Sequence, residues 1–171
     1  MIENFDTSLS HVLKSEGLWS DNPKDPGGAT MKGITLAVYR EWKRNPHITK
    51  EELRVIPDED VYNLYKQNYW DKVHGDDLPA GVDYAVFDSA VNMGVGRAAK
   101  LIQEAAGVTA DGVLGPASLS AIQKANNKEL IEKFSQLKES FYRSLKTFPI
   151  FGKGWLNRVA EVKTLSESML G

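Results

Sequence analysis

The stretch KSEGLWSDNPKDPGGATMKGIT, from Lys14 to Thr35, differs from the rest of the chain. An amphipathic helix precedes it, and the residues that share one face of that helix are Phe5, Leu9, Val12 and Glu16. The stretch itself is rich in Gly, Pro and Asp, which favour turns, and has room only for short strands within 28–34. We therefore expect the first helix to end at its glutamate, followed by a long loop with at most a small β-hairpin.

The remaining sequence has a helical pattern almost throughout. Thr35 and Thr49 stand at N-cap positions, Pro116 suits the first turn of a helix, and Gly107 suits the end of one. Helical segments are predicted within 36–44, 58–73, 80–107 (broken at Gly94 and Gly96), 127–146 and after residue 155. The fold class predicted is mainly α. We expect two parts, 1–70 and 71–171, packed as one compact unit with a shared cleft.

Composition excludes several classes of protein. The 171 residues are 42% hydrophobic and 26% charged, which is ordinary for a folded soluble domain. A net charge of −2 without a basic run argues against a nucleic-acid partner. The absence of cysteine excludes a disulfide scaffold, and the three histidines are dispersed. We therefore expect no metal and no cofactor, and we expect a monomer.

The N-terminus MIENFDTSLSHVLKSEG lacks a basic region followed by an apolar core, so it is not a secretory signal. No apolar run approaches the ~20 residues that span a bilayer, so membrane insertion is not expected. We expect synthesis in the cytoplasm without a signal peptide. A target outside the cytoplasm then requires a separate route of release.

Glu16 is the first candidate for chemistry. It continues the apolar face of the first helix and stands in the last turn, where the negative end of the helix dipole disfavours a carboxylate. Partial burial acts in the same direction, and both effects favour the neutral acid that a general acid must be. The alternative interpretation is a solvated residue at a helix end, and spacing alone does not separate the two.

The loop that follows offers partners for such an acid. Asp25 and Thr30 lie in a Gly-rich segment able to fold back over the helix end, and an acid facing an ionised carboxylate is the arrangement that cleaves glycosidic bonds. Asp25 is alternatively a turn former before proline, and Asp21 is a competing second carboxylate. Trp19 is either a platform for stacking on a sugar or a plug in the core.

The whole stretch resembles the signature of glycoside hydrolase family 108, the N-acetylmuramidases of phage endolysins and related bacterial proteins. In that family an EGG motif is followed by an Asp-Pro loop and by GG-x-T-x-x-G-I-T. The matching positions here are Glu16-Gly17, Asp25, Gly27-Gly28, Thr30, Gly33, Ile34 and Thr35. Leu18 departs from the pattern, because it replaces the second glycine of EGG. The resemblance implies a lysozyme-like helical fold with Glu16 as the catalytic glutamate.

The order Glu, Asp, Thr is also similar to that of T4-type phage lysozymes. This weaker analogy implies that Asp25 is the second carboxylate and that Thr30 holds the attacking water. The second half is similar to the predicted peptidoglycan-binding domain of family 108, which implies peptidoglycan as the partner. The features that match this domain are Tyr69-Trp70-Asp71, Pro79, Phe87-Asp88, Ala90 to Gly94, Asp111-Gly112 and Gly115-Pro116.

Two residues of the second half are candidates for binding sugar. Trp70 either stacks on the apolar face of a pyranose or fills a junction in the core. Asn92 precedes the break at Gly94, and its amide either caps the helix or binds a hydroxyl or N-acetyl group. Asp88, one helical turn earlier, is placed to orient Asn92. Asp111-Gly112 and Gly115-Pro116 are typical of turns.

These features predict a lysozyme-type peptidoglycan hydrolase, in the setting of a phage or prophage endolysin that reaches the wall by holin-type release. Two rival functions remain at this point. A lytic transglycosylase also uses a single glutamate. A non-catalytic peptidoglycan-binding or secretion accessory protein would have no reason to keep Glu16 on an apolar helix face.

Overall fold

The computed structural model describes residues 2–23 and 28–170, and Asp25 lies outside the described residues. The elements in chain order are α1 (Ile2–Glu16), β1 (Trp19–Ser20), β2 (Thr30–Met31), β3 (Ile34–Thr35), α2 (Leu36–Lys43), α3 (Lys50–Arg54), α4 (Asp58–Tyr65), η1 (Lys66–Trp70), η2 (Asp71–Val73), η3 (Gly75–Asp77), α5 (Val82–Met93), α6 (Val95–Ala106), α7 (Pro116–Lys124), α8 (Asn127–Arg143) and α9 (Phe148–Ser168). The predicted mainly α fold class is confirmed.

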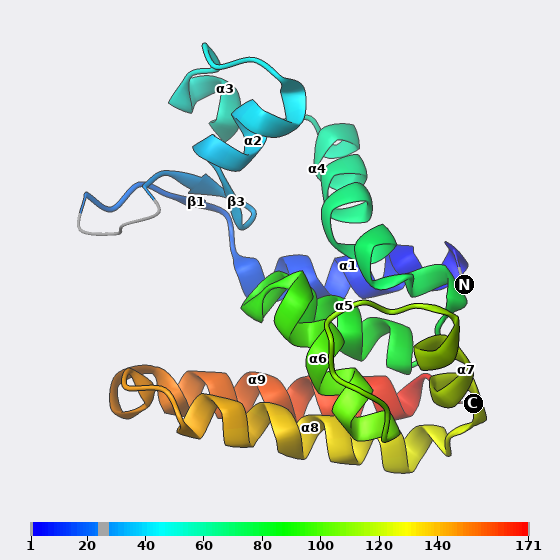
Figure 1. The fold of residues 1–171 in the computed structure, drawn as a ribbon. Helices are drawn as coiled ribbons and strands as arrows, with labels where there is room; N and C mark the ends of the chain where they lie inside the picture. Colours follow the sequence, from blue (N-terminus) through cyan, green and yellow to red (C-terminus); the bar gives the residue numbers. More distant parts are fainter. Residues whose placement is uncertain (1, 24–27, 171) are drawn as a thin grey trace. The chain divides into compact units, whose positions relative to one another are not determined.

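The chain forms two compact units (Figure 1). The N-terminal unit is Asp6–Asn68. The C-terminal unit is Tyr69–Gly171 together with Met1–Phe5, so the first residues of α1 and the remainder of that helix belong to different units.

The N-terminal unit contains a small antiparallel sheet with strand order β1-β2-β3. Trp19 pairs with Met31 across the first strand pair, and Met31 pairs with Ile34 across the second. Lys32 and Gly33 connect β2 to β3 with φ of 52° and 78°. Two successive positive φ values are typical of the tight hairpin turn that follows the twist of its strands, and glycine adopts such a conformation without steric cost. The sheet therefore contains the predicted hairpin and one further short strand.

Helices α2, α3 and α4 complete this unit, with α2 and α3 beside the sheet (Figure 1). The Tyr39 hydroxyl of α2 donates a 2.7 Å hydrogen bond to Asp60 of α4. Burial and then this bond raise the pKa of Tyr39 to about 12. Because the bond joins two helices, it holds α4, and with it Tyr65, in register with the rest of the unit.

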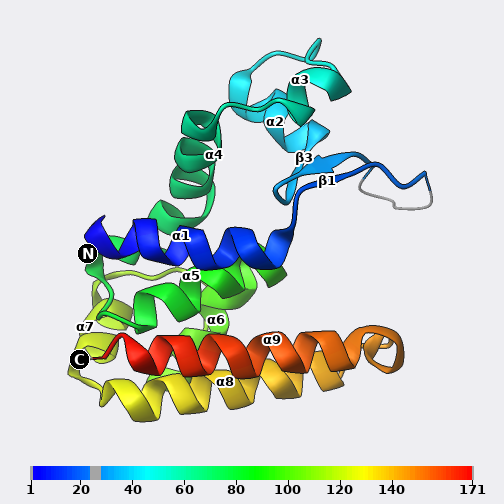
Figure 2. The ribbon, with the colours of Figure 1, turned by 180° about the vertical axis from the view of Figure 1, so that it is seen from behind.

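The C-terminal unit consists mainly of long helices. Helices α8 and α9 run side by side along their length, and α5 and α6 pack on them (Figure 2). Helix α5 is the central element, since every residue from Val82 to Ala90 is buried. The Leu and Phe positions early in α8, Leu130 and Phe134, are buried as their spacing predicts.

The first residues of the chain are part of this C-terminal unit. The Asn4 amide donates to both carboxylate oxygens of Asp83 at 2.7 and 2.9 Å. Phe5 has no exposed surface, and its ring makes edge contacts with Trp70 and Phe87 at centroid distances of 5.2 and 5.5 Å. The N-terminal segment thus fills part of the core of this unit.

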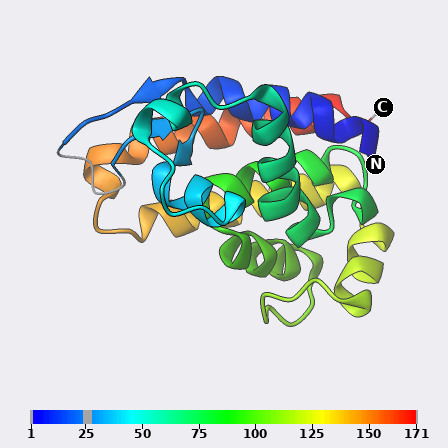
Figure 3. The ribbon, with the colours of Figure 1, turned by 90° about the horizontal axis from the view of Figure 1, so that it is seen from above.

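A buried glutamine organises the loop between α6 and α7, which lies at the edge of the C-terminal unit (Figure 3). Gln103 donates to the Asp111 carboxylate at 2.9 Å and to the Val113 carbonyl at 2.8 Å, and it accepts from the Gly112 N–H. The Val113 N–H and Gln103 lower the pKa of Asp111. Asp111-Gly112 therefore has the role of a turn.

The local sequence signals for helix ends are confirmed. The Thr35 hydroxyl accepts from the Val38 N–H, the Thr49 hydroxyl accepts from the Glu52 N–H, and Gly107 ends α6 with φ of 76°. The predicted helix over 58–73 is α-helical only to residue 65, and it continues as a π turn and a 3₁₀ turn. Of the two predicted breaks, the structure has one at Gly94, while Gly96 lies within α6.

Candidate active site

Glu16 is the last residue of α1 and is half-buried. Leu9 and Val12, which precede it on the same helix face, are buried. The following residue, Gly17, has φ of 75°, and its N–H donates to the Leu13 carbonyl at 3.3 Å. A left-handed glycine satisfies the last carbonyls of a helix and turns the chain away from its axis. The carboxylate therefore sits at the point where the chain leaves the helix.

The β2–β3 turn lies directly against this carboxylate. A methyl group built on Gly33 would stand 3.0 Å from Glu16 Oε2 and 2.7 Å from the Tyr65 hydroxyl. Tyr65 is buried, and its hydroxyl donates a 2.6 Å hydrogen bond to the Lys32 carbonyl of the same turn. The Lys32 N–H in turn donates to the Leu18 carbonyl at 3.2 Å. Tyr65 and the backbone thus fix the turn beside Glu16, and glycine leaves the space that the carboxylate uses.

Two other predicted residues lie in the sheet. Thr30 is in the central strand, where it pairs with Ser20 on one side and Thr35 on the other. Trp19 is half-buried in the edge strand β1, and the Arg54 guanidinium lies over its ring at 5.5 Å. One ring face of Trp19 is therefore occupied by a cation. Their roles in catalysis and binding remain predictions.

The second carboxylate has two candidates. Asp21 directly follows β1, is exposed, and forms an ion pair with Lys50 at 3.4 Å. Asp25 lies outside the described residues, so its placement beside Glu16 stays a prediction.

In the N-terminal unit, the Glu16 carboxylate is thus held against a tight turn. Residues 9–94 match the family described as Glycosyl hydrolase 108, which covers half of the chain. This protein belongs to glycosyl hydrolase family 108. Residues 97–160 match a second family, described as Predicted Peptidoglycan domain. The protein is therefore a glycoside hydrolase that acts on peptidoglycan.

A solved structure supports this membership. The chain is 39% identical to the protein in the structure titled "Structure of Brucella abortus SagA", with a TM-score of 0.90. The match covers 99% of this chain and 97% of that one, so it extends over the segments that match the two families. The search of curated proteins returned no match.

The sugar-stacking role predicted for Trp70 is wrong in this structure. The side chain has 0% exposure, and its ring packs on Phe5 and on Phe87 at 5.2 and 5.4 Å. Gly75 lies so close to the ring that any side chain there would overlap it. The indole N–H donates to Asp76 at 2.8 Å. Trp70 therefore fills the core of the C-terminal unit, which was the alternative interpretation.

Asn92 of this family 108 chain lies near the end of α5, and its amide donates to the Tyr142 hydroxyl of α8. Asp88 does not take the expected role of orienting Asn92. Instead Asp88 is buried and accepts hydrogen bonds from the Arg158 guanidinium of α9 at 2.9 and 3.3 Å. Asn92 thus reaches an aromatic side chain, and its binding role remains a prediction.

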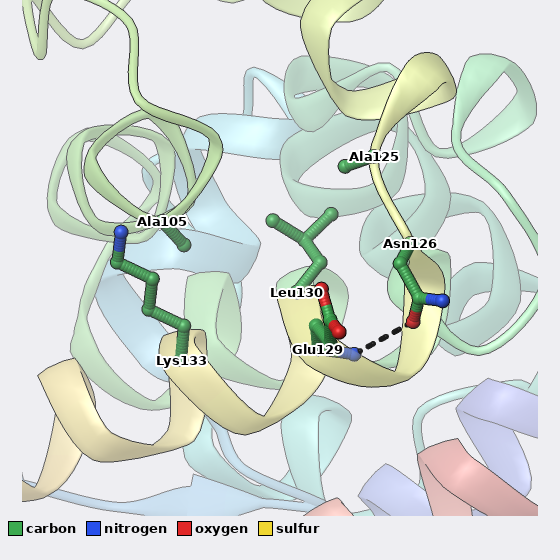
Figure 4. Close-up of a pocket in the computed structure, with 6 residues that line it drawn as sticks. All are labelled: Ala105, Ala125, Asn126, Glu129, Leu130 and Lys133. Carbon is green, nitrogen blue, oxygen red and sulfur yellow. Dashed lines mark hydrogen bonds between the residues drawn. The ribbon is translucent and has the colours of Figure 1, made fainter.

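A pocket of about 200 Å³ in the C-terminal unit is a poor alternative site (Figure 4). Its lining residues are Ala105, Ala125, Asn126, Glu129, Leu130 and Lys133. The Asn126 side chain caps α8 by accepting from the Glu129 N–H at 3.0 Å, so its oxygen is already engaged. None of the predicted site residues lies there. Within the described residues, no group of three or more His, Asp or Glu side chains could hold a metal ion.

The close approach of Gly33 to Glu16 and to the Tyr65 hydroxyl was not predicted from the sequence. The dipeptide Lys32-Gly33 between two short β-type segments is a signal for a two-residue hairpin turn. Tyr65 gave no signal beyond its apolar helix face, because its partner Lys32 lies 33 residues away. Across residues 2–23 and 28–170, no helix has the length and apolar character needed to cross a membrane.

Proposed function

We propose that this protein is an N-acetylmuramidase that hydrolyses the β-1,4 bond between N-acetylmuramic acid and N-acetylglucosamine. The observation that supports this proposal best is Glu16, half-buried at the end of α1 against the Gly33 backbone. General acid catalysis requires a carboxyl group in its protonated form, placed within reach of the leaving oxygen. That form donates the proton which the departing sugar oxygen needs.

The proposed mechanism divides the work between two carboxyl groups. Glu16 protonates the glycosidic oxygen, and an ionised carboxylate stabilises the oxocarbenium-like transition state or activates water. Asp25, with Thr30 holding the water, takes this second role. Asp21, which follows β1 and pairs with Lys50 at 3.4 Å, is the competing residue.

The test of the acid is Glu16→Gln, assayed by loss of turbidity of outer-membrane-stripped cells. Glutamine keeps the size of the side chain but has no proton to transfer, so we expect activity to fall by ~10²–10⁴-fold or more. Circular dichroism and binding to intact sacculi should stay as in the wild type. Lysis within a few-fold of wild type would overturn the assignment of Glu16.

The second carboxylate is tested by comparing Asp25→Asn with Asp21→Asn in the same assay. We expect the first change to abolish most activity and the second to have a small effect. A severe loss in Asp21→Asn with near-normal activity in Asp25→Asn would transfer the role to Asp21.

A lytic transglycosylase is a second candidate, because such an enzyme can work with one glutamate, and Glu16 against the Gly33 turn could be that residue. Such an enzyme closes a 1,6-anhydro ring on muramic acid in place of adding water. Mass spectrometry of digested sacculi separates the two reactions. We expect a product with a reducing muramic acid end. A product with an anhydro end would show that the enzyme is a transglycosylase and not a hydrolase.

We also propose the biological setting of a phage or prophage endolysin, made in the host cytoplasm and released to the wall through a holin-type pore. The resemblance of residues 14–35 to family signatures found in endolysins supports this setting. Expression in a bacterial cytoplasm should leave cells intact until a holin is co-expressed. Lysis at the same rate without the holin would contradict the proposed route.

A further inference from the structure

The junction of α8 and α9 is unusual in charge. From residue 140 to residue 160 the sequence has no Asp or Glu but has four Lys or Arg, in a chain whose net charge is −2. Two of the four are engaged by acids outside this segment, Arg143 with Glu139 and Arg158 with Asp88, both at 2.9 Å. Lys146 and Lys153 are exposed. The junction therefore presents positive charge to solvent.

Aromatic rings gather at the same place. The ring of Tyr142 stacks on Trp155 with centroids 4.9 Å apart and planes 24° apart, and Phe151 follows at 5.7 Å from Trp155. Tyr142 is buried and is bonded to Asn92, whereas Trp155 is half-buried and Phe151 is 53% exposed. The rings thus form a row that is anchored in the core and opens to solvent at its outer end.

The row is held rigidly by the start of α9. Gly152 is buried, and a side chain there would overlap the Phe148 ring, which packs across the first turn of the helix. An exposed ring on a fixed helical turn loses little conformational entropy when a ligand covers it. The exposed side chains of Ile150 and Phe151 are adjacent, and a contiguous apolar patch of this kind is a candidate contact surface.

We propose that the α8–α9 junction binds the glycan strand of peptidoglycan. Phe151 and Trp155, one turn apart on the same face of α9, contact the sugar, while Lys146 and Lys153 add positive charge to the junction. The C–H face of a pyranose is apolar and suits an aromatic ring. The free carboxylates of the stem peptides are anionic and complement the two lysines. All four residues lie within 97–160, the segment that matches the Predicted Peptidoglycan domain. This inference rests on the proposed function, because it assigns a binding surface for the same substrate.

The test measures binding of the full-length Glu16→Gln protein to purified sacculi, by sedimentation on ice. Phe151→Ala should weaken binding by about tenfold, as expected for one anchoring ring. The matched control is Val113→Ala, which removes a 68% exposed apolar side chain from the same unit and should leave binding unchanged. Unaltered binding in Phe151→Ala would overturn the proposal.

The charge is tested in the same assay. Replacing both Lys146 and Lys153 with Ala should weaken binding at low salt and reduce its salt dependence, since exposed charges act through a screened field. Replacing Lys124 and Lys128, which are also exposed in this unit, controls for net charge. Equal losses in both double variants would show that total charge, and not this surface, attracts the wall.

A membrane is the competing partner, and Ile150 distinguishes it. Ile150 is 76% exposed beside Phe151, so insertion into lipid would use both side chains, whereas stacking on sugar uses only the ring. Phosphatidylglycerol vesicles should not bind the protein, and Ile150→Ala should bind sacculi normally. If the protein binds vesicles, and if Phe151→Ala and Ile150→Ala both lose vesicle binding but still bind sacculi, the surface binds lipid.

Failure of this inference is distinguishable from failure of the proposed function. Binding is read in a variant designed not to cleave, and soluble sugar released during the incubation is measured alongside it. Continued cleavage by Glu16→Gln would overturn the catalytic assignment while the binding comparison still stands. Conversely, normal binding by Phe151→Ala would overturn the proposed binding surface but would not affect the role of Glu16.

Discussion

At the scale of single residues, the surroundings of Glu16 depend on a position without a side chain. Gly33 has φ of 78°, and any β-carbon there would press on the Glu16 carboxylate and the Tyr65 hydroxyl. Periodicity alone placed Glu16 on the buried face of its helix, which is a local property of the sequence. Its contact with Gly33 depends on the fold of the intervening loop, and so the helix pattern carried no sign of it.

We predict that Gly33→Ala lowers both stability and activity, because alanine is strained at positive φ and its methyl group displaces the acid. The matched control is Gly28→Ala, since Gly28 has φ of 71° but no atom within 4 Å of the added carbon. Both variants should lose about 1 kcal/mol of unfolding free energy from the backbone. Turbidity assays should show a ~10-fold or greater additional loss of kcat only in Gly33→Ala. Equal activity in the two would mean that the turn does not position Glu16.

At the scale of elements, α5, α8 and α9 enclose a charged group in their interface. Lys138 of α8 is buried, and its ammonium lies 5.3 Å from the Phe134 ring. Burial lowers the pKa of Lys138 to about 8, Arg158 acts in the same direction, and Asp88 opposes them. Helix ends were predictable because capping residues act on adjacent backbone. A lysine within a periodic helix carries no local sign of burial, so the buried group of Lys138, Asp88 and Arg158 was not predictable.

The linkage between protonation and folding gives a pH prediction for Lys138. The folded protein releases this proton near pH 8, whereas the unfolded chain keeps it to about pH 10.4, so the free energy of unfolding rises with pH between those values. Tyr142, with a pKa raised to about 12, acts oppositely only above about pH 10, where unfolded tyrosines ionise.

We therefore predict that Lys138→Met is more stable than wild type at neutral pH by ~1–3 kcal/mol. This difference in unfolding free energy should narrow from about pH 8 to pH 10. Urea unfolding across this range measures it, and Lys133→Met on the exposed face of α8 is the control. If the difference in unfolding free energy does not change with pH, or if Lys138→Met is less stable than wild type at neutral pH, burial of the Lys138 ammonium does not destabilise the protein.

At the scale of the whole molecule, the family match and the compact units have different boundaries. The Glycosyl hydrolase 108 match runs from residue 9 to residue 94 and so ends just after α5, while the N-terminal unit ends at Asn68. The predicted division at residue 70 lies near the second of these. The sugar-stacking role predicted for Trp70 was wrong because its burial depends on distant parts of the chain. Phe5, whose ring contacts Trp70, is far from it in the sequence, so no local pattern indicates their contact.

We predict that Phe5→Ala destabilises the C-terminal unit by about 3–5 kcal/mol, the usual cost of removing a buried aromatic ring. Trp70 fluorescence should report the change, since the two rings are in contact at 5.2 Å. The control is Phe151→Ala, which removes an exposed ring and should shift unfolding by less than about 0.5 kcal/mol. A small effect of Phe5→Ala would show that this unit does not need the N-terminal segment.

The split of α1 between the two units also bears on how such a gene can be rearranged. A cassette cut at residue 69 would encode the C-terminal helices without Asn4 and Phe5, so Asp83 would lose the Asn4 side-chain donor and a void would form beside Trp70. Recombination that exchanges the C-terminal unit for another would therefore have to exchange the codons for Asn4 and Phe5 as well. The opening residues of the chain and its second half should then vary together during evolution, as one inherited module interrupted by another.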